Sequence, residues 1–196
     1  MKIRTYILIV ATLLMTSCAS EKSEQKEKAK EEHSHHDHSA HTGSSNSKSP
    51  RTAAMANIGS NHVHIDYSAP SVRGREIFGG LVAFGEVWVT GAHTATSISF
   101  NEDLEIEGKS IPAGKYALFT IPGREKWTLI LNKNYEQHLA DDYEESEDVG
   151  RWEVIPSNLE EPVEQLRFEV LEVDEKNGLL KFAWSETGFE VKLSVK

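Results

Sequence analysis

Histidines are the residues of this chain whose type and spacing point most directly to chemistry. Five of the nine histidines lie within residues 32–41, and they are His33, His35, His36, His38 and His41. Neutral imidazole binds Zn(II), Cu(II) and Ni(II) well, and His-rich tracts are a compositional signal for metal binding. The tract therefore predicts chelation of Zn or Cu. The alternative, a soluble low-complexity linker without a biological metal, stays open.

A second group of histidines suggests a metal site inside a folded domain. His62 and His64 are two residues apart, so on a strand they project from the same face, with Asp66 next along it. His93 follows a turn-like Thr-Gly-Ala segment. Two strand imidazoles and a third His or a carboxylate can build a small metal site in a β domain. The alternative, which the pattern favours, is the polar outer face of an edge strand.

Two arginines form a candidate anion site. Arg73 and Arg75 flank Gly74, with Ser68 and Ser71 close by in the sequence. The forked guanidinium group matches the oxygens of a carboxylate or phosphate. The segment therefore predicts ligand binding through Arg73 and Arg75. The structural alternative is a Pro/Gly-rich loop whose arginines pair with the many acids of the chain.

The N-terminus has the pattern of an export signal. Lys2 and Arg4 precede an apolar run from Tyr6 to Met15, and Thr16 and Ser17 precede Cys18, the one cysteine of the chain. An apolar run of ~10 residues is too short to span a bilayer, which takes ~20. The order resembles a bacterial lipoprotein signal, in which the cysteine after the cut is lipidated. We expect a signal at residues 1–17, lipidation of Cys18 and export to the cell envelope, with the outer membrane as the default destination.

The charge balance limits the classes of partner. The formal net charge is −10, and residues 51–196 carry −11 of it, because Lys2 and Arg4 add +2 and residues 19–50 hold six acids and five lysines. An acidic domain repels phosphate backbones, so nucleic acid is not an expected partner. It gains nothing from anionic lipid either, so the lipid anchor would provide the contact with the membrane. With Cys18 lipidated, no thiol remains for disulfides or thiolate catalysis.

The residues between the signal and the domain have the composition of a flexible tether. Residues 18–50 contain no aromatic side chain, and they are rich in Lys and Glu and then in Ser, Gly and Asn. Such a segment cannot bury enough apolar surface to offset the entropy lost on ordering. We therefore expect a tether at 18–50 that carries the His-rich tract, followed by one domain at 51–196.

Hydrophobic periodicity in residues 51–196 has period two. Apolar residues alternate with polar ones over 166–171, 180–185 and 189–196, which predicts strands with one face in a core. The runs 116–121 and 127–131 are apolar on both faces, so we expect central strands there. The four tryptophans fall at strand spacing, which favours core positions over a sugar-stacking platform.

Turn signals divide these strands into hairpins. Glu107-Gly108-Lys109 and Lys176-Asn177-Gly178 separate neighbouring strands, and Thr187-Gly188 precedes the last one. The segment best suited to a helical turn is Asn134–Asp148. Short strands about ten residues apart, with almost no helical pattern, predict an all-β antiparallel β-sandwich or jelly-roll-like domain.

Several long strings resemble one family. They cover residues 67–80, 84–92, 112–123 and 127–132 and include Tyr-Ser-Ala-Pro-Ser-Val-Arg-Gly-Arg-Glu-Ile-Phe-Gly-Gly and Pro-Ala-Gly-Lys-Tyr-Ala-Leu-Phe-Thr-Ile-Pro-Gly. On these motifs the chain is similar to the bacterial family called domain of unknown function 2911, over roughly residues 50–196. The resemblance implies a secreted or lipid-anchored β-rich domain, often from Bacteroidetes-like bacteria. It implies no established activity and carries over no functional residue.

The chain departs from that family at one motif. Similar sequences usually read Trp-Arg-Thr-Gly-Ala-Asn where this chain has Trp88-Val89-Thr90-Gly91-Ala92-His93. If the usual Arg and Asn line a site, this chain has altered it, and His93 is the candidate substitute.

These observations favour a binding protein over an enzyme. The chain has no Gly-x-Ser-x-Gly elbow, phosphate loop or His-Glu-x-x-His motif. The preferred interpretation is a non-catalytic envelope lipoprotein that binds a small ligand or an envelope protein, with a metal-chelating tail. The alternative is a metal-dependent hydrolase or other enzyme that uses His62, His64 and His93.

Overall fold

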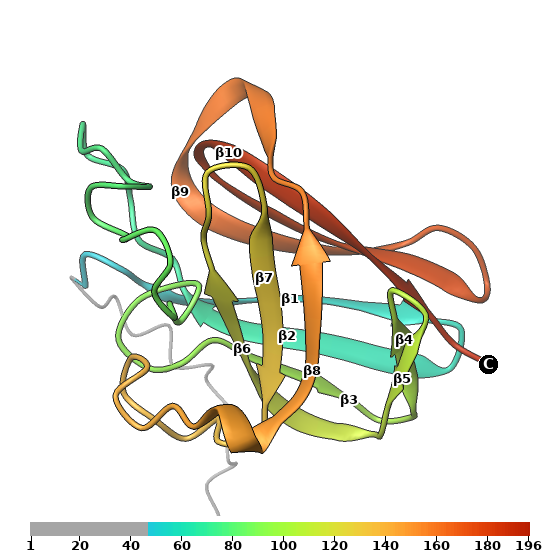
Figure 1. The fold of residues 1–196 in the computed structure, drawn as a ribbon. Coiled ribbons are helices and arrows are strands. Elements are labelled where there is room, and N and C mark those ends of the chain that lie inside the picture. The colour runs from blue at the N-terminus through green and yellow to red at the C-terminus, as the bar shows by residue number, and fades with distance from the viewer. Residues whose placement is uncertain (1–46) are drawn as a thin grey trace, which may run out of the picture. The chain divides into compact units, whose positions relative to one another are not determined.

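The computed structural model describes residues 47–196, which form two antiparallel β-sheets (Figure 1). The larger sheet has the strand order β1-β2-β3-β6-β7-β8, and the smaller has the order β5-β4-β10-β9. The bounds are β1 Arg51–Ile58, β2 Asn61–Ser68, β3 Ser97–Phe100, β4 Leu104–Ile106, β5 Lys109–Ile111, β6 Gly114–Ile121, β7 Trp127–Asn132, β8 Asp148–Val154, β9 Ser157–Glu172 and β10 Asn177–Ser194. The expected all-β sandwich is confirmed.

Several predictions concern residues before position 47. The signal at 1–17, the lipidated Cys18, the five histidines of the tract and most of the tether lie outside the described residues. Within residues 47–196, no helix has the length and apolar character needed to cross a membrane.

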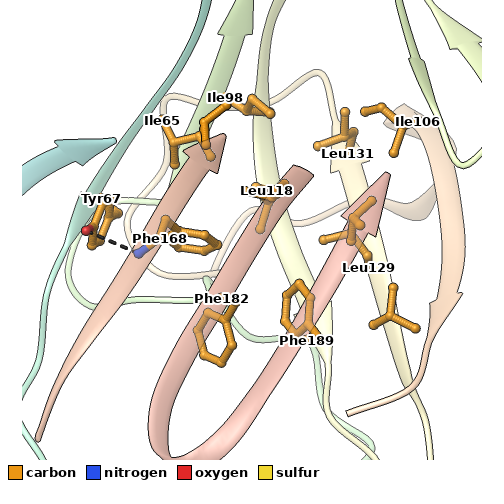
Figure 2. Packing of buried hydrophobic residues seen from close by; sticks show 14 of the residues in the cluster. Ile65, Tyr67, Ile98, Ile106, Leu118, Leu129, Leu131, Phe168, Phe182 and Phe189 are labelled. Atoms are coloured by element: carbon orange, nitrogen blue, oxygen red, sulfur yellow. Dashed lines mark hydrogen bonds between the residues drawn. The ribbon is translucent and has the colours of Figure 1, made fainter. Parts of the chain in front are cut away.

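The core lies between the two sheets, where side chains of both interdigitate. On β2 the odd-numbered Val63, Ile65 and Tyr67 are buried, while the even-numbered His62, His64 and Asp66 are exposed or half-buried. Figure 2 shows Ile65, Ile98, Leu118 and Leu129 of the larger sheet facing Phe168, Phe182 and Phe189 of β9 and β10. The phenol oxygen of Tyr67 accepts a hydrogen bond from the Phe168 main-chain N–H (3.2 Å), which ties the two sheets together. The period-two pattern thus gives each strand its inward face.

β6 and β7 are buried on both faces, as their apolar runs predict. Leu118 and Leu129 face β9 and β10 in the main core. Ala117, Phe119 and Ile130 face the other way and pack with Val89 and Ala95 in a second cluster. Loop segments therefore cover the outer face of these central strands, which explains why no polar residue alternates there.

β10 differs from the prediction, which placed a strand boundary at Thr187-Gly188. The strand is continuous from Asn177 to Ser194, and its pairing with β9 shifts register on both sides of Ser185. Inward residues are even-numbered before this point (Phe182, Trp184) and odd-numbered after it (Phe189, Val191). The extra residues of these register shifts lie on β9, and the positive φ of Ser185 (55°) accompanies the reversal of the alternation along β10, which does not end the strand.

The hairpin between β9 and β10 is where it was predicted, but its turn precedes the Asn-Gly pair. The Asp174 carboxylate accepts hydrogen bonds from the main-chain N–H groups of Lys176 and Asn177 (both 2.9 Å) and from the Asn177 side chain. These bonds lower the pKa of Asp174. Gly178 lies in β10, where a Cβ would come within 2.3 Å of Ile58 Cδ1. Its small size therefore permits close packing.

The helical turn expected over Asn134–Asp148 is mostly absent. One 3₁₀ turn, η1 (Glu145–Glu147), forms, and the rest is irregular. The Asn132 side chain donates to Glu144 O (2.9 Å) and Asp148 Oδ1 (2.8 Å), so side-chain bonds hold the backbone here in place of helical ones. The Tyr143 hydroxyl donates to Asp148 (2.8 Å), and its burial and this bond raise the pKa of Tyr143 to about 12.

Candidate functional site

The candidate site is built on the long connection between β2 and β3, residues 69–96. Its first part pairs with β9: Val72 N–H donates to Glu164 O (2.8 Å), and Leu166 N–H donates to Pro70 O (2.9 Å). Its later part pairs with β6 through the reciprocal bonds of Trp88 and Thr120 (2.8 and 2.9 Å). The connection is therefore fixed to a strand of each sheet and forms an ordered wall.

The end of this connection is fixed by its own hydrogen bonds. Thr96 Oγ1 donates to Thr90 O (3.1 Å), and the Trp88 indole N–H donates to Gly91 O (3.2 Å). A Cβ on Gly91 would lie 2.8 Å from Thr96 Oγ1, so this close turn requires glycine. His93 O accepts from Leu139 N–H (2.6 Å), which brings the loop before η1 against the turn.

These segments border an open-mouthed cavity of about 450 Å³. Its deeper wall consists of buried or half-buried residues, namely Ser49, Pro70, Val82, Trp88, Gly91, Ala92 and Trp184. Its rim consists of exposed residues, namely Lys48, Arg73, Arg75, Leu81, His93 and Leu139. The volume lies within the range of small-molecule sites, ~300–1,000 Å³, and an apolar wall with a few polar groups is typical of them.

The rim is cationic although the domain is acidic. Lys48, Arg73, Arg75 and His93 border the cavity, and among residues 47–196 no Asp or Glu does. The sequence from residue 51 onward carries −11, so this arrangement runs against the overall charge. Basic groups around a concave surface create a local field that attracts anions.

Arg73 and Arg75 are held by main-chain carbonyl groups. Arg75 donates through Nε to Val72 O (3.0 Å) and through Nη2 to Ser71 O (2.6 Å). Arg73 Nη2 donates to Lys48 O (3.1 Å). Within residues 47–196 neither guanidinium has an ion pair with a carboxylate, although the acid-pairing alternative anticipated one. Glu164 Oε1 accepts from the Arg73 main-chain N–H (3.0 Å). Neutral acceptors fix the side chains without neutralising their charge.

The structure separates the two positions at which the chain departs from the family pattern. Val89 is 1% exposed and packs in the second hydrophobic cluster, away from the cavity. His93 borders the cavity, at a φ of 63°. Asn, Asp and His enter this left-handed region more readily than other side chains, so a His in place of Asn is compatible with the backbone here. Of the two departures from the family pattern, only His93 therefore changes the residues that border the cavity.

His62 and His64 lie on the outward face of β2, as their spacing predicts. The imidazole centroids are 6.1 Å apart, and His64 Nε2 lies 3.2 Å from Asp66 Oδ1. His62 Nδ1 lies 2.8 Å from Asn57 Oδ1. In the described part of the chain, no three or more His, Cys, Asp or Glu side chains are grouped so that they could hold a metal ion. His62 and His64 are thus neighbours on β2, whereas His93 borders the cavity together with Arg73 and Arg75.

Unusual backbone conformations gather around the cavity. Of the six non-glycine residues with positive φ among residues 47–196, three border it: Arg73 (50°), His93 (63°) and Leu139 (50°). Such conformations cost free energy and persist where surrounding contacts enforce them, often at binding sites. Here the hydrogen bonds of the wall provide that enforcement.

Sequence reasoning identified part of this lining. Arg73, Arg75 and His93 were candidates, and the structure brings these three together. Leu81 and Leu139 were missed, because an isolated exposed leucine carries no local signal. Trp184 was expected in the core, which is correct, but its place behind the cavity depends on how β10 packs against the connection.

The fold and cavity define the class as an all-β domain with a cationic-rimmed pocket. The chain belongs to the family described as protein of unknown function (DUF2911), whose model matches residues 49–193. This confirms the resemblance drawn from the sequence motifs. No curated protein and no solved structure was found to match the chain.

Proposed function

We propose that residues 51–196 form a non-catalytic binding domain that holds a small ligand in the cavity bordered by Arg73, Arg75 and His93. The observation that carries the proposal is a cavity of about 450 Å³ that has an apolar wall and a cationic rim, in a domain that is acidic overall. A preformed concave site with a few convergent polar groups is the usual form of a ligand site. The enclosing loops are fixed by hydrogen bonds, so little ordering entropy is lost on binding.

The proposed setting is the cell envelope. The signal-like residues 1–17 and the following Cys18 support export and lipid anchoring, with the outer membrane as the destination. The composition of residues 18–50 supports a flexible tether between lipid and domain. The histidines within that tether support accessory chelation of Zn or Cu. An envelope protein remains the second class of partner for the domain.

The test is a thermal-shift screen of small metabolites against the chain from residue 19 onward, in two matched variants. Ala92→Trp places a large side chain in the cavity wall, whereas Ala83→Trp places the same side chain at an exposed position outside it. We expect ligands that stabilise the wild type and A83W but not A92W. Ligands that stabilise all three equally would place binding elsewhere and contradict the proposal.

The enzyme alternative has a separate readout. Each stabilising ligand is incubated with the protein in the presence of Zn(II), and its mass is followed for release of a product. We expect the ligand to be recovered unchanged. Turnover that is lost in His62→Ala or His93→Ala would replace the binding module with a metal-dependent enzyme.

A further inference from the structure

We infer that the ligand of this cavity is an organic anion of about 15 non-hydrogen atoms, with a flat apolar body against Trp88 and its acid group at Arg73 and Arg75. The inference rests on the proposed function and names the ligand class of the same cavity. Three independent features carry it: the volume, the fixed aromatic wall and the free charge of the rim.

The volume limits the size of the ligand. One water occupies ~30 Å³ of liquid, so a cavity of about 450 Å³ corresponds to about 15 water-sized groups. A folded protein domain is too large to enter. An inorganic ion or acetate would leave most of the apolar wall in contact with water.

The wall presents a rigid aromatic surface. Trp88 is half-buried and stacks on the buried Trp184, with ring centroids 5.7 Å apart and planes 20° apart. Phe78 meets the Trp88 ring edge-on at 6.0 Å, and the Trp88 indole N–H is bound to Gly91 O. The ring therefore cannot turn to fit a round or branched ligand. A flat body gains the most contact on such a surface.

The rim adds apolar surface that water now contacts. Leu81 is 51% exposed and Leu139 is 40% exposed, and both border the cavity. Burying apolar surface contributes roughly 25 cal/mol per Å². A ligand that lies against Trp88 and extends to the rim would cover both leucines, so the apolar part of the ligand contributes to affinity as well as the acid group.

The charge of the rim determines the sign of the ligand. The main-chain carbonyls that hold Arg73 and Arg75 leave their positive charges without a carboxylate partner in the described residues. Lys48 and His93 stand at the same rim, and the Glu164 carboxylate accepts a hydrogen bond from the Arg73 main-chain N–H rather than from its guanidinium. An acid group can accept from the unused guanidinium N–H groups, whereas a cationic ligand would be repelled.

The inference is tested by isothermal titration calorimetry with probes that differ in one property. 2-Naphthoate and 2-naphthamide have the same size and flat body but differ in charge. Decanoate keeps the carboxylate and replaces the flat body by a flexible chain, and acetate removes the body. The protein is the chain from residue 19 onward, with a metal chelator present so that the histidine tract takes up no metal.

We expect 2-naphthoate to bind at least about tenfold more tightly than 2-naphthamide, which one charge-assisted hydrogen bond supports. Decanoate should bind more weakly than 2-naphthoate, and acetate should show no measurable binding. Arg73→Gln/Arg75→Gln should lose the preference for the acid. The control Lys126→Gln/Lys192→Gln removes two exposed positive charges that do not border the cavity. This control should keep the preference for the acid.

The outcomes separate the two proposals. If naphthamide and naphthoate bind equally and Ala92→Trp blocks both, the anion inference fails while the cavity remains a binding site. If none of the four probes binds, the anion inference fails, and the thermal-shift screen still decides the proposed function. If a probe binds and its binding survives Ala92→Trp, it binds outside the cavity, and the proposed function itself fails. If the lysine control loses the acid preference as fully as the arginine variant, the preference reflects overall charge, and the assignment to Arg73 and Arg75 is wrong.

Discussion

The indole rings of Trp88 and Trp184 stack with their centroids 5.7 Å apart and their planes inclined by 20°. One ring comes from the connection between β2 and β3 and the other from β10, so the contact joins the cavity wall to the smaller sheet. Trp184 is 1% exposed and Trp88 is half-buried. The same pair therefore packs in the core on one side and borders the cavity on the other.

The two tryptophans should differ in their effect on stability. Trp184→Ala removes a fully buried ring and should lower the free energy of unfolding by about 3–5 kcal/mol. Trp88→Ala should cost roughly half of that, because part of its ring already faces solvent. Urea unfolding followed by circular dichroism measures both. Equal losses would mean that the Trp88 ring is as deeply packed as Trp184 and contributes little accessible surface to the cavity.

The positive φ of Ser185 should favour glycine over the β-branched residues that strands usually prefer. Ser185 has a φ of 55°, which glycine adopts freely and a β-branched residue tolerates poorly. Ser185→Gly should therefore stabilise the domain, by about 0.5 kcal/mol, and Ser185→Val should destabilise it by about 1–2 kcal/mol. Chemical denaturation measures both changes. Stabilisation by Val, the outcome expected for an ordinary strand position, would exclude the left-handed conformation.

The turn that joins β9 to β10 should give pH-dependent stability through Asp174. Its pKa is lowered from 3.8 by hydrogen bonds from the Asn177 side chain and the Lys176 main chain. A lowered carboxylate pKa stabilises the fold above the unfolded-state value, and this contribution is lost as the pH falls through the folded-state value. Asp174→Ala should be less stable than the wild type at pH 5–7, and the difference should shrink below about pH 3.8. A difference that persists unchanged at pH 2.5 would assign the effect to turn geometry.

Lipidation is testable at Cys18. Cys18→Ala should abolish incorporation of labelled palmitate and release the protein from the membrane fraction in a bacterial host. Ser17→Ala keeps a small residue before the cysteine and serves as the matched control, which should still be labelled. Membrane retention of Cys18→Ala without label would indicate an anchor other than lipid.

Metal uptake is expected to follow the histidine tract. Mass spectrometry of untagged residues 19–196 should find Zn or Cu, and the same measurement on residues 50–196 should find substantially less. The form with residues 19–196, with His33, His35, His36, His38 and His41 changed to Ala, should hold as little metal as residues 50–196. Metal near one equivalent in the short form would instead assign a metal site to the domain and support the enzyme alternative.

The hydrophobic pattern was enough to predict most strands but not where one strand continues into the next. Alternation along residues 180–184 and 189–195 gave the inward faces correctly. The switch from even to odd at Ser185 looked like a strand boundary, because local sequence does not distinguish a bulge from a turn. Pairing with β9 keeps β10 continuous. The helical expectation over residues 134–148 failed for a similar reason, since the competing hydrogen bonds come from Asn132 and Asp148.

The sequence by itself determined the all-β class, the family, the central position of β6 and β7, and the candidacy of Arg73, Arg75 and His93. These follow from side-chain periodicity and from chemistry that each residue carries wherever it lies. Only the tertiary structure decided that the two arginines and His93 share one cavity with Leu139 and Trp184. Their proximity depends on hydrogen bonds and packing between segments far apart in the chain. No local sequence pattern encodes contacts between distant segments. These contacts bring the separate candidate residues together at one cavity.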